Sequence, residues 1–223
     1  MKRGSWIISQ TWENLFFLNF ITSYENLRKI VPQHLKLDSF QGDYFTSIVP
    51  FQMSDVSFPF TPSLPFSRLN ELNLRTYVTY ENVPGIYFFT LDSNHRIANF
   101  IARNFFHLPY RYSNMHLRKN EGFYQFKSNC AQLSFKIGQS RVKNDRDKFI
   151  TDRYFLFTQD KKFVLRGQVM HEPWVLHNVE ELNYVESLND EFDVKDHVYS
   201  NSFYSPGFDV YFKPFKKVGT ISA

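Results

Sequence analysis

The stretch ARNFFHLPYRYS, residues 102–113, gathers side chains that could bind or polarise a small molecule. Arg103 and Arg111 carry planar guanidinium groups that suit a carboxylate, and the hydroxyl of Tyr110 can both donate and accept a hydrogen bond. Pro109 separates them and predicts the end of the preceding helix. Two interpretations stay open: one wall of a binding site, or a helix end that carries polar residues for structural reasons.

A second candidate lies in LNLRTYVTY, residues 72–80, where apolar and polar residues alternate as in a strand. One face carries Leu72, Leu74, Thr76 and Val78, and the other carries Asn73, Arg75, Tyr77 and Thr79. Arg75 and Tyr77 are neighbours on the second face, which could point into a barrel. The alternative for Arg75 is a solvated position on the outside.

Two helices are predicted around these residues. The first spans 23–31, with Ser23 as its N-cap and Pro32 after its end. The second has Asp92 or Ser93 as its N-cap and is ended by Pro109. The remaining periodic segments favour strands, at 43–51, 72–80, 86–91, 122–128, 130–137, 152–158, 161–170 and 207–213. The residues QDKK are expected to form a hairpin turn between the strands at 152–158 and 161–170.

This order of elements predicts an α+β fold that is mostly antiparallel β, with one main helix and a short N-terminal helix. Aromatic residues make up 19% of the chain and also favour strands. Residues 1–223 show no linker or repeat, so we expect one domain. The Pro-rich segment 58–66 is expected to be an extended loop, either packed on the surface or covering a pocket, and 140–149 is expected to be a solvated loop.

Composition argues against several classes of function. The net charge is +4, but the basic residues are dispersed, so we expect no nucleic-acid partner. No apolar run approaches the roughly 20 residues of a membrane span, and the N-terminus lacks a signal-peptide pattern. One cysteine, Cys130, and the absence of an N-x-[ST] site suit a reducing compartment. These features predict a cytoplasmic protein of a bacterial-type cell.

Several chemistries lack their motifs. The sequence has no G-x-S-x-G elbow, no P-loop and no G-x-G-x-x-G fingerprint. In HEPWVLH, residues 171–177, the two histidines are six positions apart and Pro173 interrupts any helix, so zinc ligation of the H-E-x-x-H type is not expected. We therefore predict no metal and no cofactor, and assign no catalytic residue.

Residues 72–115, from LNLRTYVTY to HLPYRYSNM, resemble the YqjF-like family of bacterial proteins. Residues 31–53 and 152–174 agree with the same pattern. That family in turn resembles, distantly, the acetoacetate decarboxylase superfamily. The resemblance implies an antiparallel β-barrel or cone with a buried pocket.

In those decarboxylases a segment similar to G-R-E-x-x-G-x-P-K-K supplies the Schiff-base lysine directly after a proline. On this segment, Pro109 stands at the proline, Tyr110 takes the place of the lysine and Arg111 lies beside it. A phenol cannot form an imine with a ketone, and a guanidinium stays protonated. The resemblance therefore implies a pocket without Schiff-base decarboxylation.

The sequence thus predicts a small-molecule-binding barrel for a polar or anionic, partly apolar ligand. The pocket candidates are Arg75, Tyr77, Arg103, Tyr110 and Arg111. One alternative is an enzyme that uses non-covalent acid–base chemistry on a carbonyl or carboxylate, with Tyr110 as a proton donor polarised by Arg111. Another is a structural or partner-binding protein with a filled barrel. A homodimer also stays open, since symmetric dimers are common.

Overall fold

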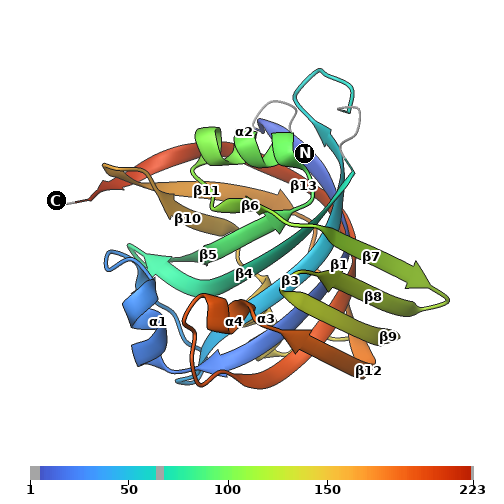
Figure 1. Cartoon of the computed structure of the whole chain (residues 1–223). Helices are drawn as coiled ribbons and strands as arrows, with labels where there is room; N and C mark the ends of the chain where they lie inside the picture. The colour runs from blue at the N-terminus through green and yellow to red at the C-terminus, as the bar shows by residue number, and fades with distance from the viewer. Residues whose placement is uncertain (1–5, 64–67, 222–223) are drawn as a thin grey trace.

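The computed structural model describes residues 6–63 and 68–221, and Figure 1 labels their helices and strands. The strands in these ranges are β1 Ile8–Thr22, β2 Lys36–Leu37, β3 Tyr44–Ser57, β4 Leu69–Tyr80, β5 Val83–Ser93, β6 Tyr110–Tyr112, β7 Met115–Asn120, β8 Phe123–Ser128, β9 Ala131–Arg141, β10 Phe155–Gln159, β11 Phe163–His171, β12 Leu176–Glu186 and β13 Val198–Thr220. The helices are α1 Tyr24–Ile30, α2 Arg96–Phe106, α3 Asp145–Thr151 and α4 Leu188–Glu191.

Seven of the described strands close into a barrel, in the order β1, β3, β4, β5, β10, β11 and β13. The barrel closes because β13 pairs with both β11 and β1. The ladder between β1 and β13 is antiparallel and runs from Ile8↔Phe212 to Ile21↔Val198. Most other pairs are also antiparallel, whereas β5 pairs in parallel with β10 and with the short β6. Closure leaves an interior that side chains must fill or a ligand can occupy.

A second layer covers one side of the barrel. The sheet continues from β13 through β12, β9, β8 and β7, and Figure 1 shows these strands together beside the barrel. Their aromatic side chains pack on residues that point outward from β1. Phe16 stacks on Phe135 at 4.4 Å between ring centroids, and Tyr124 stacks on Phe135 at 4.5 Å.

The middle of β1, residues 15–20, is therefore buried on both faces. Along β1, Phe16, Leu18 and Phe20 belong to the outer hydrophobic cluster, whereas Leu15 and Phe17 belong to the cluster inside the barrel. This accounts for the continuous run LFFLNF, because neighbouring residues of a strand point to opposite faces and here neither face meets water. The high aromatic content serves these two cores.

The fold class predicted from the sequence is confirmed: the described chain is mostly β, with a closed barrel, one main helix and a short N-terminal helix. Helix α1 is capped by the Ser23 hydroxyl, which accepts a hydrogen bond from the Asn26 backbone N–H at 3.2 Å. The QDKK turn also forms, between β10 and β11.

Two local predictions were wrong. Neither Asp92 nor Ser93 caps α2, because both belong to β5, and the ring of His95 caps the helix by accepting from the Ala98 N–H at 3.1 Å. The segment 140–149 is not simply a loop, because α3 begins within it. An Asn144–Asp147 capping box, in which each side chain accepts a backbone hydrogen bond from the other residue, stabilises that start.

Part of the Pro-rich segment 58–66 lies outside the described residues, since 64–67 are not among them. Its described portion contains a turn closed by two hydrogen bonds. The Thr61 hydroxyl accepts from the Phe58 backbone N–H at 3.1 Å and donates to the Phe58 carbonyl oxygen at 3.0 Å. Phe60 is fully exposed and Phe58 is partly exposed. Whether the segment covers a pocket stays a prediction.

We expect Gly207→Ala to destabilise the barrel strongly. Gly207 has a φ of +118°, and a Cβ built there would lie 1.9 Å from the Trp12 carbonyl oxygen on the paired strand β1. The loss should be about 3 kcal/mol or more, or roughly 6–12 °C in Tm for a domain of this size. Gly122→Ala is the control, because its φ is +80° but no atom lies within 4 Å of the added Cβ. Equal losses in the two variants would show that the β1–β13 contact does not limit stability.

Candidate functional site

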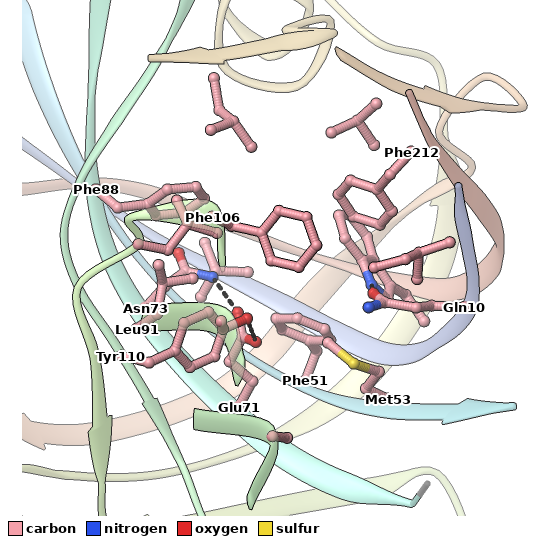
Figure 2. A pocket seen from close by; sticks show the side chains of 18 of the residues that line it. Gln10, Phe51, Met53, Glu71, Asn73, Phe88, Leu91, Phe106, Tyr110 and Phe212 are labelled. Carbon is pink, nitrogen blue, oxygen red and sulfur yellow. Dashed lines mark hydrogen bonds between the residues drawn. The ribbon is translucent and has the colours of Figure 1, made fainter. Parts of the chain in front are cut away.

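The barrel contains a partly open cavity of about 250 Å³. This is slightly below the roughly 300–1,000 Å³ of drug-sized ligand sites, so it suits a small molecule. Its lining is mostly apolar and comes from the barrel strands and from α2, which lies over one end of the barrel in Figure 1. Figure 2 shows the aromatic rings of Phe51, Phe88, Phe106 and Phe212 around the space.

Three polar side chains of β4 line this apolar space: Glu71, Asn73 and Arg75. They are two residues apart and therefore share a face, which is the inner face of the barrel. From Glu71 to Arg75 the strand advances by roughly 13 Å at about 3.3 Å per residue. The row thus places an acidic group, an amide and a cation in sequence along one wall of the cavity.

A bulge in the neighbouring strand β5 shapes the adjacent part of that wall. Asn73 pairs with Leu91 and Arg75 pairs with Phe88, so β5 uses one more residue than β4 across this interval. The extra residue lets both Leu91 and Phe88 line the cavity, although they are three positions apart. The bulge therefore keeps the apolar side chains of β5 beside the polar row, on the same inner face.

Glu71 forms the tightest contact within the site. Its side chain is 2% exposed, and its Oε2 atom accepts a hydrogen bond of 2.6 Å from the Tyr110 hydroxyl. Asn73 Nδ2 makes a longer contact of 3.5 Å with Oε1. Figure 2 shows the carboxylate between these two groups and beside the ring of Phe51. No cation forms an ion pair with Glu71 within the described ranges.

Burial changes the acidity of both partners. It raises the pKa of the Glu71 carboxyl from its ordinary 4.5 to about 7, more than the hydrogen bonds from Tyr110 and Asn73 lower it, and the charge of Asp92 adds slightly to the rise. Burial, together with the charge and hydrogen-bond acceptance of Glu71, raises the pKa of Tyr110 well above its ordinary value. Glu71 can therefore gain or lose a proton near neutral pH, whereas Tyr110 keeps its own.

Arg75 is a buried cation without a counter-ion among residues 6–63 and 68–221. Its side chain is 8% exposed, no described carboxylate forms an ion pair with it, and its Nε has no hydrogen-bond partner. The guanidinium lies over the rings of Phe17 and Tyr77, at 5.1 and 6.0 Å from their centroids. Such contacts offset only part of the cost of burying a charge. The group is therefore suited to an anion that enters the cavity.

Of the five predicted pocket residues, the described cavity lining contains Arg75 and Tyr110. Tyr77 is buried on the same face of β4, but beyond the end of the cavity, where its hydroxyl bonds Ser47 Oγ at 2.6 Å. Arg103 is exposed on α2. A ligand confined to this cavity would touch neither of them.

Arg111 also lies outside the lining, because it points to the opposite side of β6 from Tyr110. Its guanidinium binds both oxygens of Asp92, at 2.8 Å each, and also pairs with Glu191. Phe192 packs against it. The expected contact in which Arg111 polarises Tyr110 is thus replaced by a structural ion pair, and Glu71 is the partner of the phenol.

Sequence reasoning missed Glu71, although a signal was present. Residue 71 continues the alternation of 73, 75 and 77 backward by one step, so it shares their face. His171, Trp174 and Arg153 also line the cavity. Burial lowers the pKa of His171, while Arg153 is held by Asp38 at 2.7 Å. His171 ends β11, whereas Trp174 and Arg153 lie in segments that connect other elements, all far from β4 in sequence, so spacing along the sequence could not reveal them.

Within residues 6–63 and 68–221, no group of three or more His, Cys, Asp or Glu side chains is placed to hold a metal ion. None of the described helices combines the length and apolar character needed to cross a bilayer.

The closed barrel with its covering sheet is the fold of acetoacetate decarboxylase-like enzymes. The acetoacetate decarboxylase of Legionella pneumophila superposes with a TM-score of 0.72 at 12% identity, covering 100% of this chain and 92% of that one. The enduracididine biosynthesis enzyme MppR complexed with pyruvate gives 0.68 at 10% identity, covering 100% and 93%. At such identities the similarity establishes the fold.

Sequence comparison identifies the family. Residues 9–209 match the DUF2071 family, described as "Uncharacterized conserved protein (COG2071)". The Bacillus subtilis (strain 168) protein YqjF is 36% identical over 198 residues, which cover 84% of this chain and 82% of that protein. The chain belongs to the DUF2071 family, and the resemblance noted in the sequence is confirmed.

We expect the free energy of unfolding to depend on pH through the ionisation of Glu71. Its folded pKa of about 7 exceeds its ordinary 4.5, so the folded state binds the proton more tightly than the unfolded state. The corresponding stabilisation is complete below about pH 4.5 and is lost as the pH rises through about 7, for a total of about 3 kcal/mol. Denaturant unfolding from pH 4.5 to 8 should show this loss in the wild type but not in Glu71→Gln.

Glu81→Gln is the matched control, because Glu81 is exposed at the turn that follows β4. It should keep the pH dependence of the wild type. A Glu71→Gln variant whose stability falls with pH as steeply as that of the wild type would contradict the raised pKa.

We expect Arg111→Met to cost about 3 kcal/mol, because it leaves the buried Asp92 carboxylate without its cation. The double variant Asp92→Asn, Arg111→Met should recover part of this loss, since no unpaired charge remains. Arg118→Met, at an exposed position on β7, is the control. Urea unfolding measures all three. A loss no larger than that of the control would show that the ion pair is not stabilising.

Proposed function

We propose that the barrel cavity binds a small carboxylate with a mostly apolar body, and that Arg75 binds the carboxylate group. The observation that carries this proposal is the buried guanidinium of Arg75, which faces an apolar cavity and has no counter-ion among the described residues. An uncompensated buried charge is costly, and a ligand carboxylate would offset that cost with paired, charge-assisted hydrogen bonds.

The remainder of the lining suits the body of such a ligand. Side chains from α2 and from the barrel strands surround the space with aliphatic and aromatic groups, as Figure 2 shows. An apolar body gains free energy by leaving water for this environment. The cavity also argues against the alternative of a filled barrel, which would leave no interior volume for a ligand.

The names of two structural relatives are consistent with a carboxylate ligand. One is an acetoacetate decarboxylase, and MppR was solved with pyruvate. Acetoacetate and pyruvate are both small oxo carboxylates. No lysine occurs among the described lining residues, and Tyr110 stands where the resemblance places the Schiff-base lysine. We therefore propose that this ligand is held without a covalent imine.

Arg75→Met tests the proposal with 4-methylpentanoate and 4-methyl-2-oxopentanoate, each compared with its uncharged amide. The wild type should bind the acids more tightly than the amides. The variant should lose about 2 kcal/mol of acid binding, or roughly 30-fold in Kd, because a charge-assisted hydrogen-bond pair is removed. Isothermal titration calorimetry measures both affinities.

Arg103→Met is the control, because Arg103 is exposed on α2 outside the lining and its loss should leave acid binding unchanged. If the wild type binds none of the four probes, or binds acid and amide equally, the cavity is not a carboxylate site.

A further inference from the structure

The cavity opens between α2 and the segment that follows β3. Of the described lining residues, three are exposed to solvent: Phe58, Ile97 and Ile101. A side chain that contacts both the cavity and the solvent lies at the opening between them. Figure 1 shows α2 over this end of the barrel, with the segment after β3 at the same end. The opening therefore has an apolar rim, formed by these three side chains.

The apolar surface extends beyond the rim. On α2, the side chains of Ile97, Phe100 and Ile101 are 68%, 60% and 41% exposed, and we call these three residues the docking face. They are three and four residues apart, so they lie on one side of the helix. Phe60, two residues beyond Phe58, is 99% exposed. A cluster of large apolar side chains in water indicates a surface that a protein or a membrane covers.

The charges on α2 beside the docking face are positive. Arg96 and Arg103 are exposed, lie one helical turn before and after Phe100, and form no ion pair with a described carboxylate. The sequence contains no Asp or Glu from residue 93 to residue 120. Asn104, the polar residue on this side of the helix, donates a hydrogen bond of 2.7 Å to the Phe100 carbonyl oxygen. The surface thus complements a partner that is anionic at its boundary and apolar beneath it.

A second copy of the chain is a poorer partner for this surface. In a symmetric dimer built on α2, the same patch meets itself, so Arg96 and Arg103 would face the same cations of the other copy. The segment 93–120 supplies no carboxylate to compensate them. Such a contact would bury apolar area but bring like charges together, whereas a lipid surface offers both phosphates and an apolar interior.

We propose that α2 docks this protein on the surface of an anionic lipid bilayer. The docking face enters the boundary between headgroups and acyl chains, while Arg96 and Arg103 bind lipid phosphates beside it. A helix of this kind lies in the plane of the membrane, so it needs no spanning segment. With only 11 residues, α2 buries little apolar area, and the association is therefore reversible.

Docking turns the opening of the cavity toward the lipid. Ile97 and Ile101 belong both to the rim and to the docking face, so a ligand can pass between bilayer and cavity with little exposure to water. A carboxylate with an apolar body is an amphiphile that concentrates at such a surface. This consequence rests on the proposed carboxylate site, whereas the docking itself does not.

Vesicle flotation tests the docking with the full chain and without any cavity ligand. The probes are vesicles of phosphatidylcholine alone and vesicles of phosphatidylcholine with phosphatidylglycerol in equal parts. The wild type should bind the anionic vesicles about tenfold more tightly than the neutral ones, because two arginines contact the charged surface. The affinity for anionic vesicles should fall as the salt concentration rises.

Two variants separate the apolar contribution from the electrostatic one. Phe100→Gln should weaken binding to anionic vesicles about tenfold, because an exposed ring no longer leaves water. Arg103→Gln should weaken it about fivefold, because one cation is lost at the lipid surface. Neither side chain lines the cavity, so both variants should bind carboxylates as the wild type does.

Val142→Gln and Arg118→Gln are the matched controls. Val142 is 94% exposed after β9, and Arg118 is exposed on β7 in the covering sheet. Neither residue belongs to α2 or to the rim, so both variants should bind vesicles as the wild type does. If Arg118→Gln weakens binding as much as Arg103→Gln, the attraction depends on net charge alone and the assignment to α2 is wrong.

The remaining outcomes also decide the proposal. Absence of binding to anionic vesicles, or binding that Phe100→Gln leaves unchanged, overturns docking through α2. A dimer in analytical ultracentrifugation that Phe100→Gln dissociates, together with absence of vesicle binding, shows that a second copy covers this face instead. Calorimetry with the carboxylate probes is independent of these results, so failure of the docking leaves the carboxylate site standing, and failure of that site leaves the docking standing.

Discussion

Closure of the barrel by β13 is the constraint on which the interior depends. This strand is 23 residues long and pairs with β11 and β1. It pairs with β12 at one residue pair, His177↔Tyr204. If β13 were separated from β1, the inner face of every barrel strand would lie open to water. The polar row on β4 would then be solvated, and neither the raised pKa of Glu71 nor the buried charge of Arg75 would exist. The chemistry of the site therefore depends on a backbone ladder to which Glu71, Asn73 and Arg75 do not belong.

The cavity combines two groups that a protein interior normally avoids. Arg75, a cation without a counter-ion among the described residues, and Glu71, a carboxylate without a cation among them, lie four residues apart on one strand, surrounded by aromatic side chains. The intervening distance and the Asn73 amide keep the two charges from forming a salt bridge with each other. A direct pair would satisfy both and leave nothing for a ligand to compensate. Keeping them apart lowers stability but leaves two different chemical groups directed at one volume.

The sequence predicted the parts of this structure that depend on local periodicity. Alternation along residues 72–80 identified the inner face of β4 and placed Arg75 on it, and Ser23 and Pro32 delimited α1 correctly. Glu71 was missed only because it lies one residue before the stretch that was considered. The capping box that begins α3 was also visible, in Asn144 and Asp147, within a segment interpreted as a loop.

Other features depend on tertiary structure and left no local pattern. Tyr77 shares the inward face with Arg75, yet the cavity ends before it, because Phe149 packs on its ring at 5.2 Å. Asp92 resembles a helix cap in sequence, but the ion pair with Arg111 holds it within β5. His171, at the end of β11, and Trp174, in the segment after it, both line the cavity although they lie far from β4 in sequence. Spacing along the chain carries no information about such neighbours.

The register of β6 decides whether the phenol of Tyr110 or the guanidinium of Arg111 faces the interior. Tyr110 lies opposite Leu91 and turns inward, and Arg111 lies opposite Asp92 and turns outward. Only three residues, His107 to Pro109, connect α2 to this strand. Deleting one of them and sliding β6 by a single step would exchange the phenol for the guanidinium. Glu71 would then gain a salt-bridge partner and remain ionised, and Asp92 would lose its own. The length of this connector thus sets which group faces Glu71, and with it the electrostatic character of the barrel interior.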